Sequence, residues 1–153
     1  MKKLLILFLL ISSPVFAASD FISTANERLG KPNTCLELKY DLDNGSSLTD
    51  HIYINDENKR VVFANGLSSE VLEYNDNVIK FKTVENDINN KGYVIETFYE
   101  INRYTGGCTI EKYQKAVGAM QKFDNAMFGL NQTFLYRKGT GLVKKVDNTT
   151  KKF

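Results

Sequence analysis

The sequence predicts a mainly β domain, a β-rich α+β fold in which antiparallel strands in meander order form a curled sheet or a partly closed small barrel. Two observations predict it. Over the central two thirds of the chain, apolar and polar residues alternate with a period of two, which is typical of half-buried strands. These segments are separated by clusters of Asn, Asp and Gly, which favour tight turns. Short helices are expected near 20–29 and over 112–128.

The composition suits one packed domain. Of the 153 residues, 42% are hydrophobic, with 10 Phe and 8 Tyr, which is enough apolar material for a globular core. No internal repeat, long linker or low-complexity block divides the chain. We therefore expect a single β-rich globular domain over 18–153.

The start of the chain has the features of a secretory signal peptide over 1–17. Lys2 and Lys3 precede an unbroken apolar run over 4–11, and small residues lead to Ala17. The run is shorter than the roughly 20 apolar residues that a membrane-spanning helix needs. We expect cleavage near Ala17 and a periplasmic or secreted product with no transmembrane segment.

The first elements of the expected mature chain are a short helix and a strand. Apolar residues recur at helical spacing over 20–29, and Gly30 and Pro32 end the segment. The next segment, 34–42, alternates cleanly, with leucines and a tyrosine on one face and charged residues on the other. Asn and Gly within 43–45 then supply a turn.

The remaining strands follow at short intervals. They are expected at 51–55, 60–65, 70–74, 78–84, 92–104 and 108–113, with a last strand at 132–138. For the hairpin of 78–84 and 92–104, a register with Lys80 opposite Glu96 places apolar residues on one face and charges on the other. In 112–128, apolar residues recur at steps of three and four, and this spacing predicts a helix.

Cys35 and Cys108 are the two cysteines of the chain. In an oxidising compartment an even count favours a disulfide, and only one pairing is possible. Cys35 also lies on the polar face of its strand, where a free thiol would react. We therefore predict a Cys35–Cys108 disulfide, which would stabilise the fold by about 4 kcal/mol.

The candidates for catalysis are weak. His51, the one histidine, shares a strand face with polar neighbours, and no G-x-S-x-G elbow accompanies it. Glu96 and Glu100 share a strand face about 13 Å apart, beyond the roughly 5 to 9.5 Å that paired glycosidase carboxylates require. The acidic turns lack EF-hand spacing, and no P-loop is present. We expect no metal site and no cofactor.

Basic residues gather in a C-terminal tail over about 137–153. Its lysines could touch an anionic envelope surface such as lipid headgroups, and the alternative is a solvated terminus that offsets an acidic body. Because the body is acidic and the expected compartment holds no nucleic acid, a nucleic-acid partner is excluded. The lysines concerned are Lys144, Lys145, Lys151 and Lys152.

One segment, 101–106, has a motif-like sequence, Ile-Asn-Arg-Tyr-Thr-Gly, at the end of a predicted strand. Together with the hairpin over 52–63, it resembles an apolar-Asn/Asp-Arg-x-Thr-Gly pattern in small exported proteins of Gram-negative bacteria that have no assigned role. The resemblance covers 52–109 and implies a compact β-rich domain with no established activity. Those proteins often carry a Gly-x-Cys before a lysine-rich end, whereas 139–141 here lacks the cysteine.

Aromatic residues concentrate over 93–113, and this predicts a recognition face around Phe98, Arg103 and Tyr104, since Tyr and Arg are enriched in binding hot spots. Ordinary core packing is the alternative for each aromatic residue. We expect an exported binding protein without catalysis, whose partner is a protein or a small apolar ligand. Two alternatives stay open. One is a small hydrolase with a site assembled from residues distant in sequence, and the other is an envelope-associated structural protein with a basic C-terminal segment.

Overall fold

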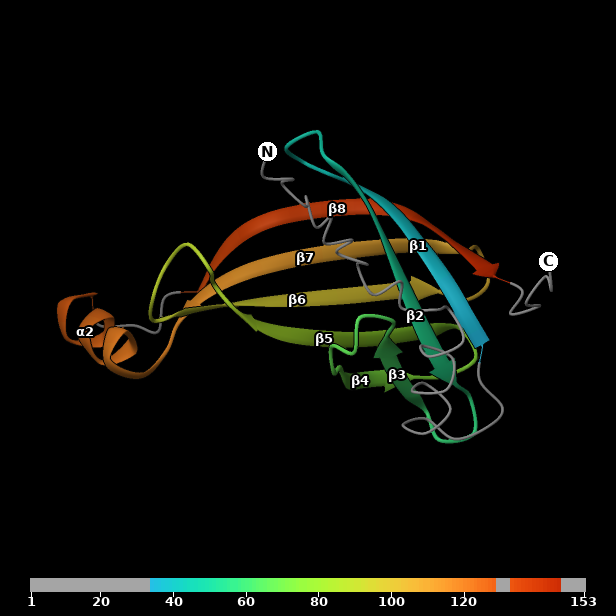
Figure 1. Cartoon of the computed structure of the whole chain (residues 1–153), viewed down its shortest axis with the longest axis horizontal. Helices are drawn as coiled ribbons and strands as arrows, with labels where there is room; N and C mark the ends of the chain where they lie inside the picture. Colours follow the sequence, from blue (N-terminus) through green and yellow to red (C-terminus); the bar gives the residue numbers. More distant parts are fainter. Residues whose placement is uncertain (1–33, 129–132, 147–153) are drawn as a thin grey trace, which may run out of the picture.

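The strands follow one another as an antiparallel meander that curls until its last strand meets its first. The computed structural model describes residues 34–128 and 133–146, which form an 8-stranded sheet of order β3-β2-β1-β8-β7-β6-β5-β4 (Figure 1). The elements are β1 (Thr34–Leu42), β2 (Ser47–Asn55), β3 (Arg60–Phe63), β4 (Glu70–Tyr74), β5 (Val78–Asn86), β6 (Tyr93–Asn102), β7 (Gly107–Ala116), α2 (Gly118–Phe128) and β8 (Thr133–Val146). Within these residues no helix has the length and the apolar character of a membrane span.

The sheet is nearly closed, with one unsealed seam between β3 and β4. There β3 contacts the residues just before β4, through an isolated bridge between Val62 and Ser68 and through the hydroxyl of Ser69, which donates to the carbonyl oxygen of Val61. Because all named strand pairs are antiparallel and consecutive except β1 with β8, the predicted meander and the partly closed barrel are confirmed.

The interior of the barrel is filled by side chains. Alternation along each strand turns one set of residues inward, as the period of two requires. At the centre the rings of Phe81 and Tyr99 stack with centroids 4.8 Å apart, and Phe63 lies 5.9 Å and 5.3 Å from them. The buried core also contains Leu38, Tyr40, Leu42, Ile52, Ile54, Val61, Ile79, Ile101, Cys108 and Ile110.

Two glycines of β8 allow the closure. A Cβ atom at Gly139 would lie 2.8 Å from the carbonyl oxygen of Asp41, and one at Gly141 would lie 2.6 Å from the Cα of Tyr40. Glycine at these positions lets the backbones of β1 and β8 approach closely. As a result β8 continues to Val146.

The prediction of a basic tail over about 137–153 is therefore wrong for residues 137–146, which belong to β8. These residues form a strand between β1 and β7, with Lys144 opposite Glu37 on β1. The sequence misleads here because Gly-Thr-Gly at 139–141 is typical of a loop, whereas in the sheet it serves close strand packing.

The hairpin of β5 and β6 forms as predicted, but in a different register. Lys80 pairs with Glu100 and not with Glu96. The register differs by an even number of residues, so the same faces of both strands point inward as predicted. However, β5 extends through Asn86, and the turn therefore lies at residues 87–92. Asp87 fixes this turn by accepting hydrogen bonds from the backbone N–H groups of Asn89 and Asn90.

The helix predicted over 112–128 is confirmed only in part. Residues 112–116 are the end of β7, and α2 begins at Gly118, which has a φ of 60°. The apolar steps of three and four in the first part of this segment are coincidental, because Tyr113 and Ala116 pair in the sheet with β6. The helix expected at 20–29 and the signal peptide lie outside the described residues.

The predicted disulfide is not formed. Cys35 and Cys108 are both free and both buried. Cys108 belongs to the main core, whereas Cys35 lies on the opposite face of the sheet with Tyr53 and Val62. The strand β8 runs between them, and its residues Val146 and Gly141 are their respective partners. Burial raises the pKa of both thiols and so lowers their reactivity, which removes the reason for expecting a bridge.

Candidate functional site

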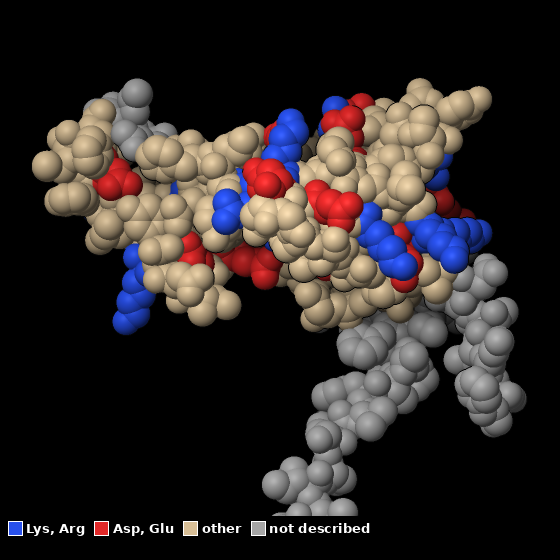
Figure 2. Space-filling model, turned by 90° about the horizontal axis from the view of Figure 1, so that it is seen from above, with Lys and Arg blue, Asp and Glu red and all other residues tan. Residues whose placement is uncertain are grey.

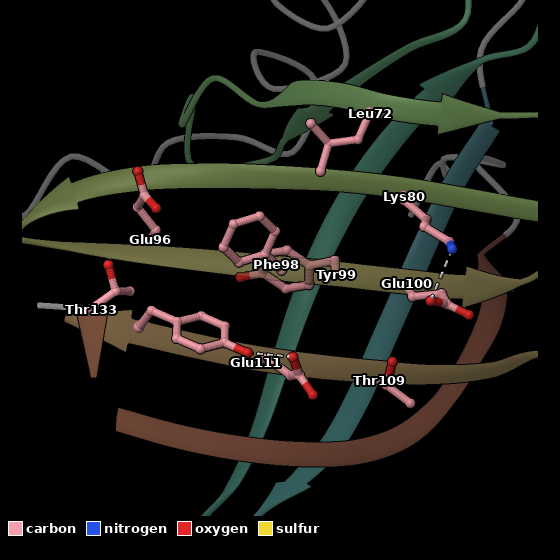
Figure 3. A pocket seen from close by; sticks show the side chains of 10 residues that line it. Leu72, Lys80, Glu96, Phe98, Tyr99, Glu100, Thr109, Glu111 and Thr133 are labelled. Atoms are coloured by element: carbon pink, nitrogen blue, oxygen red, sulfur yellow. Dashed lines mark hydrogen bonds and ion pairs between the residues drawn. The ribbon is translucent and has the colours of Figure 1, made fainter. Parts of the chain in front are cut away.

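A groove of about 460 Å³ lies on the outer face of β4 to β7 (Figure 3). Its centre is Phe98 on β6, and its apolar walls are Leu72 on β4 and Tyr113 on β7. The carboxylates around this centre belong to Glu96, Glu100 and Glu111. The groove therefore combines an apolar centre with an acidic rim.

The apolar centre follows from the alternation of the strands. Phe98 and Tyr113 point outward from neighbouring strands, and their rings meet edge to face with centroids 5.6 Å apart and an interplanar angle of 86°. On the other side, the ladder between β4 and β5 shifts register between Val71 and Glu73. This irregularity leaves Leu72 unpaired and exposed at the groove, which is how a β-bulge redirects a side chain.

The acidic rim also follows from strand geometry. Glu96 and Glu100 occupy outward positions on either side of Phe98, and Glu111 is the β7 residue directly opposite Phe98. Lys80 lies 3.5 Å from Glu100 but also 3.2 Å from Glu73 on β4, so two carboxylates share one ammonium group. Glu96 in turn lies 3.7 Å from the ammonium group of Lys115 on β7. Among the residues that line the groove, three are acidic and one, Lys80, is basic.

Glu111 is held in its charged form. Lys138 lies 3.0 Å from one of its oxygens, and the hydroxyl of Tyr113 donates to the other at 2.8 Å. Both interactions lower the pKa of Glu111, the lysine more than the tyrosine, and the same contacts raise the pKa of Lys138 and of Tyr113. A carboxylate with a lowered pKa suits the recognition of a cation better than the donation of a proton in catalysis.

The predicted recognition residues do not share one surface. Phe98 is the centre of the groove, whereas Arg103 and Tyr104 lie in the turn after β6. Arg103 donates to Asp56 at 2.7 Å and to the carbonyl oxygen of Asn75 at 3.2 Å. It therefore ties together turns at one end of the barrel, and Tyr104 beside it is almost fully exposed.

This arginine belongs to a clip across the seam. Asp56 follows β2, and it accepts a second hydrogen bond, 2.8 Å long, from the hydroxyl of Tyr74 at the end of β4. The guanidinium carbon of Arg103 lies 5.4 Å from the centroid of the Tyr74 ring. Burial is the larger cause and the hydrogen bond to Asp56 the second cause that raise the pKa of Tyr74. Its hydroxyl therefore remains a donor at neutral pH.

His51 lies apart from the groove. It is on β2, with its Nε2 atom 3.4 Å from a carboxylate oxygen of Glu37 on β1, and its side chain is partly exposed. Among residues 34–128 and 133–146 no group of three or more His, Cys, Asp or Glu side chains is arranged to hold a metal ion.

The sequence reasoning missed Leu72, Glu111 and Tyr113. The sequence does contain a pattern that indicates Glu111 and Tyr113. In the strand expected at 108–113, Thr109, Glu111 and Tyr113 occupy every second position and therefore share the outward face. The predicted helix over 112–128 also includes Tyr113, and this overlap hid the position of Tyr113 beside Phe98. No comparable pattern marks Leu72, because a β-bulge in a short strand leaves no periodic trace.

No protein-family model matches the sequence, and no curated protein matches it significantly. Any function must therefore be argued from the groove itself.

Proposed function

We propose that this chain is an exported, non-catalytic binding protein, periplasmic or secreted, whose groove receives a cationic side chain of a protein partner. The observation that carries the proposal is the outward ring of Phe98 with carboxylates on three sides, one of which, Glu111, is held in its charged form. Export rests on the signal-peptide features of 1–17.

Arginine fits this arrangement best. Its guanidinium group stacks on aromatic rings and offers paired N–H donors to carboxylates, and the two interactions are satisfied together only where a ring and a carboxylate adjoin. Phe98 and Glu111 are directly opposite each other on β6 and β7. A guanidinium lying over the Phe98 ring would therefore reach the carboxylate of Glu111.

The shape of the groove points to a side chain that projects from a larger partner. The groove lies along the outer face of the sheet and is open on one side. Enclosed apolar cavities suit small ligands, which bury most of their surface. An open aromatic and acidic surface instead resembles the central part of a protein interface, where a few anchors supply most of the affinity.

The proposal is tested by titrating the isotope-labelled 18–153 chain with a blocked arginine tripeptide and following amide shifts by NMR. The matched peptide carries citrulline, which keeps the shape of arginine but has no charge. We expect saturable shifts around Phe98 and Glu111 with the arginine peptide and a loss of about tenfold in affinity with citrulline. Equal shifts with both peptides, or shifts away from the groove, would contradict the proposal.

Variants locate the binding site. F98A removes the ring on which the guanidinium group would stack, and E111Q removes the charge of the carboxylate that it would pair with. Each variant is expected to weaken binding about tenfold. E70Q is the control, because Glu70 is an exposed carboxylate of β4 that pairs with Lys82 at 3.0 Å and does not line the groove. Equal weakening by E70Q would indicate a general charge effect.

A further inference from the structure

The groove has a direction, because three of the residues that line it follow one strand. Glu96, Phe98 and Glu100 are alternate residues of β6, and Figure 3 shows them in line along that strand. Each strand residue advances about 3.4 Å, so neighbouring members of this row are about 6.8 Å apart. Leu72 on β4 and Glu111 on β7 lie on the two sides of the row. The groove therefore runs along β6, with one carboxylate at each end.

The end of the groove at Glu100 already holds a cation. Lys80 is the β5 residue directly opposite Glu100, and its ammonium group lies 3.5 Å from the Glu100 carboxylate. Lys80 also lines the groove, so a further cation at this end would meet a like charge. The same register of β5 with β6 places Val84, and not a lysine, opposite Glu96.

The end of the groove at Glu96 is open to a further cation. The ion pair of Glu96, 3.7 Å long, is with Lys115, which does not line the groove. Lys82, two residues from Val84 on β5, pairs with Glu70 at 3.0 Å. A cation that enters from the groove therefore reaches the Glu96 carboxylate without a lysine of the groove lining beside it.

Glu96 also lies between two side chains that suit the stem of a basic residue. Val84 is directly opposite on β5 and is 48% exposed, and Tyr113 is directly opposite on β7 and lines the groove. Long basic side chains pack their methylene stems along apolar surface while the charged head stays in a polar environment. Glu96, Val84 and Tyr113, which we name the Glu96 subsite, therefore offer a carboxylate together with apolar flanks.

We propose that the groove binds an extended segment of a protein partner that carries two basic side chains two residues apart, an arginine over Phe98 and a lysine or arginine at the Glu96 subsite. This inference rests on the proposed function, which supplies the first arginine. In an extended segment, alternate side chains point to the same side and lie about 6.8 Å apart, as Phe98 and Glu96 do on β6. A basic residue one or three positions from the arginine would point away from the groove.

Local spacing is expected to decide recognition because long-range attraction is weak. The chain has a formal net charge of +2, and Figure 2 shows basic and acidic side chains next to one another on the face that it displays. A mixed surface of this kind attracts a basic peptide little from a distance. The contacts in the groove, and not the net charge of the partner, would therefore select it.

The test uses blocked peptides that contain one arginine, one lysine and threonine spacers, and that differ only in whether the lysine is one, two or three positions from the arginine. Threonine favours an extended backbone, and both orders of the two basic residues are included. Each peptide is titrated into the isotope-labelled 18–153 chain, and the amide shifts are followed by NMR. We expect the spacing of two positions to bind about fivefold more tightly than the other two spacings, with additional shifts at Val84 and Glu96.

A matched pair of variants locates the second cation. E96Q and E100Q remove carboxylates that lie two residues to either side of Phe98 on the same face of β6. E96Q should bring the three spacings to about equal affinity, because it removes the charge of the subsite. E100Q should keep the preference for two positions, whatever it does to the affinity of all the peptides together.

The outcomes separate this inference from the proposed function. Equal binding of the three spacings, with shifts around Phe98 and Glu111, would overturn the inference and leave the proposed function standing. A preference that survives in E96Q and disappears in E100Q would also overturn it, since the second cation would then lie at the Glu100 end. Shifts around Phe98 with none of the peptides would contradict the proposed function itself, and the inference with it.

Discussion

At the scale of single residues, Glu111 has the most clearly defined electrostatic environment in the groove. Its contacts with Lys138 and Tyr113 lower its pKa, so the folded state binds a proton less readily at this position than the unfolded chain does. The stabilisation from these contacts is present above the unfolded pKa of the carboxyl. It is lost as the pH falls through the lower, folded value.

We predict that an NMR pH titration of the Glu111 carboxyl carbon shows a pKa below that of an ordinary glutamate. K138M should raise this pKa, because it removes the larger cause of the shift. Lys82→Met is the matched control, since Lys82 is on β5 and pairs with Glu70. An unchanged Glu111 titration in K138M would contradict the assigned cause.

Arg103, which the sequence places in a recognition face, makes contacts within the fold. Its bonds to Asp56 and to the carbonyl oxygen of Asn75 connect turns on the two sides of the unsealed seam. Because the ion pair is partly exposed, with 27% and 52% of the two side chains accessible, its net contribution is modest.

We therefore predict that R103A lowers the free energy of unfolding by about 1 kcal/mol. The same change should leave binding at the Phe98 groove unaffected. In a double-mutant cycle with Asp56→Asn, the two changes should not be additive, since both break one interaction. Additive effects, or a loss of ligand binding in R103A, would return Arg103 to a recognition role.

At the scale of elements, the strands were predictable wherever one face is buried. Thr34–Leu42 has the bounds that its alternation predicts, because a slip of one residue would expose the apolar face. Glu70–Tyr74 also has the expected bounds, although the exposure of its side chains does not alternate. The register of β5 with β6 was not predictable. Glu96 and Glu100 lie on the same face of β6, so alternation alone allows either of them opposite Lys80. The turn that Asp87 holds selects Glu100.

The β1–β8 pair supplies a second prediction at this scale. G141A should destabilise the fold by about 3 kcal/mol, since the added methyl group overlaps the backbone of β1 near Tyr40. T140A is the control, because Thr140 is exposed on the same strand and should change stability by less than about 0.5 kcal/mol. Urea unfolding of the two variants measures the difference. A mild effect of G141A would mean that the strands can separate without loss of the barrel.

At the scale of the whole molecule, closure depends on contacts between β1 and β8, the first and last strands of the described residues. Leu42 pairs with Gly139, and no local pattern links residues so distant in sequence. For the same reason the groove was only half predictable. Phe98 could be found from its own strand, but Tyr113, Glu111 and Leu72 join it only once the strands are ordered.

Closure also decides the state of the cysteines. The fold places Cys35 and Cys108 on opposite faces of the sheet with β8 between them, and it buries both. The two thiols are therefore shielded from each other and from an external oxidant while the barrel is folded, which is compatible with the proposed export.

We predict that the native exported product starts near Ala18 and carries two free thiols. Iodoacetamide should label neither Cys35 nor Cys108 in the folded protein and should label both in concentrated urea, as read by intact mass spectrometry. A retained leader would contradict export. An intramolecular disulfide in folded material would require the strands to separate from β8, and it would therefore contradict the closed barrel itself.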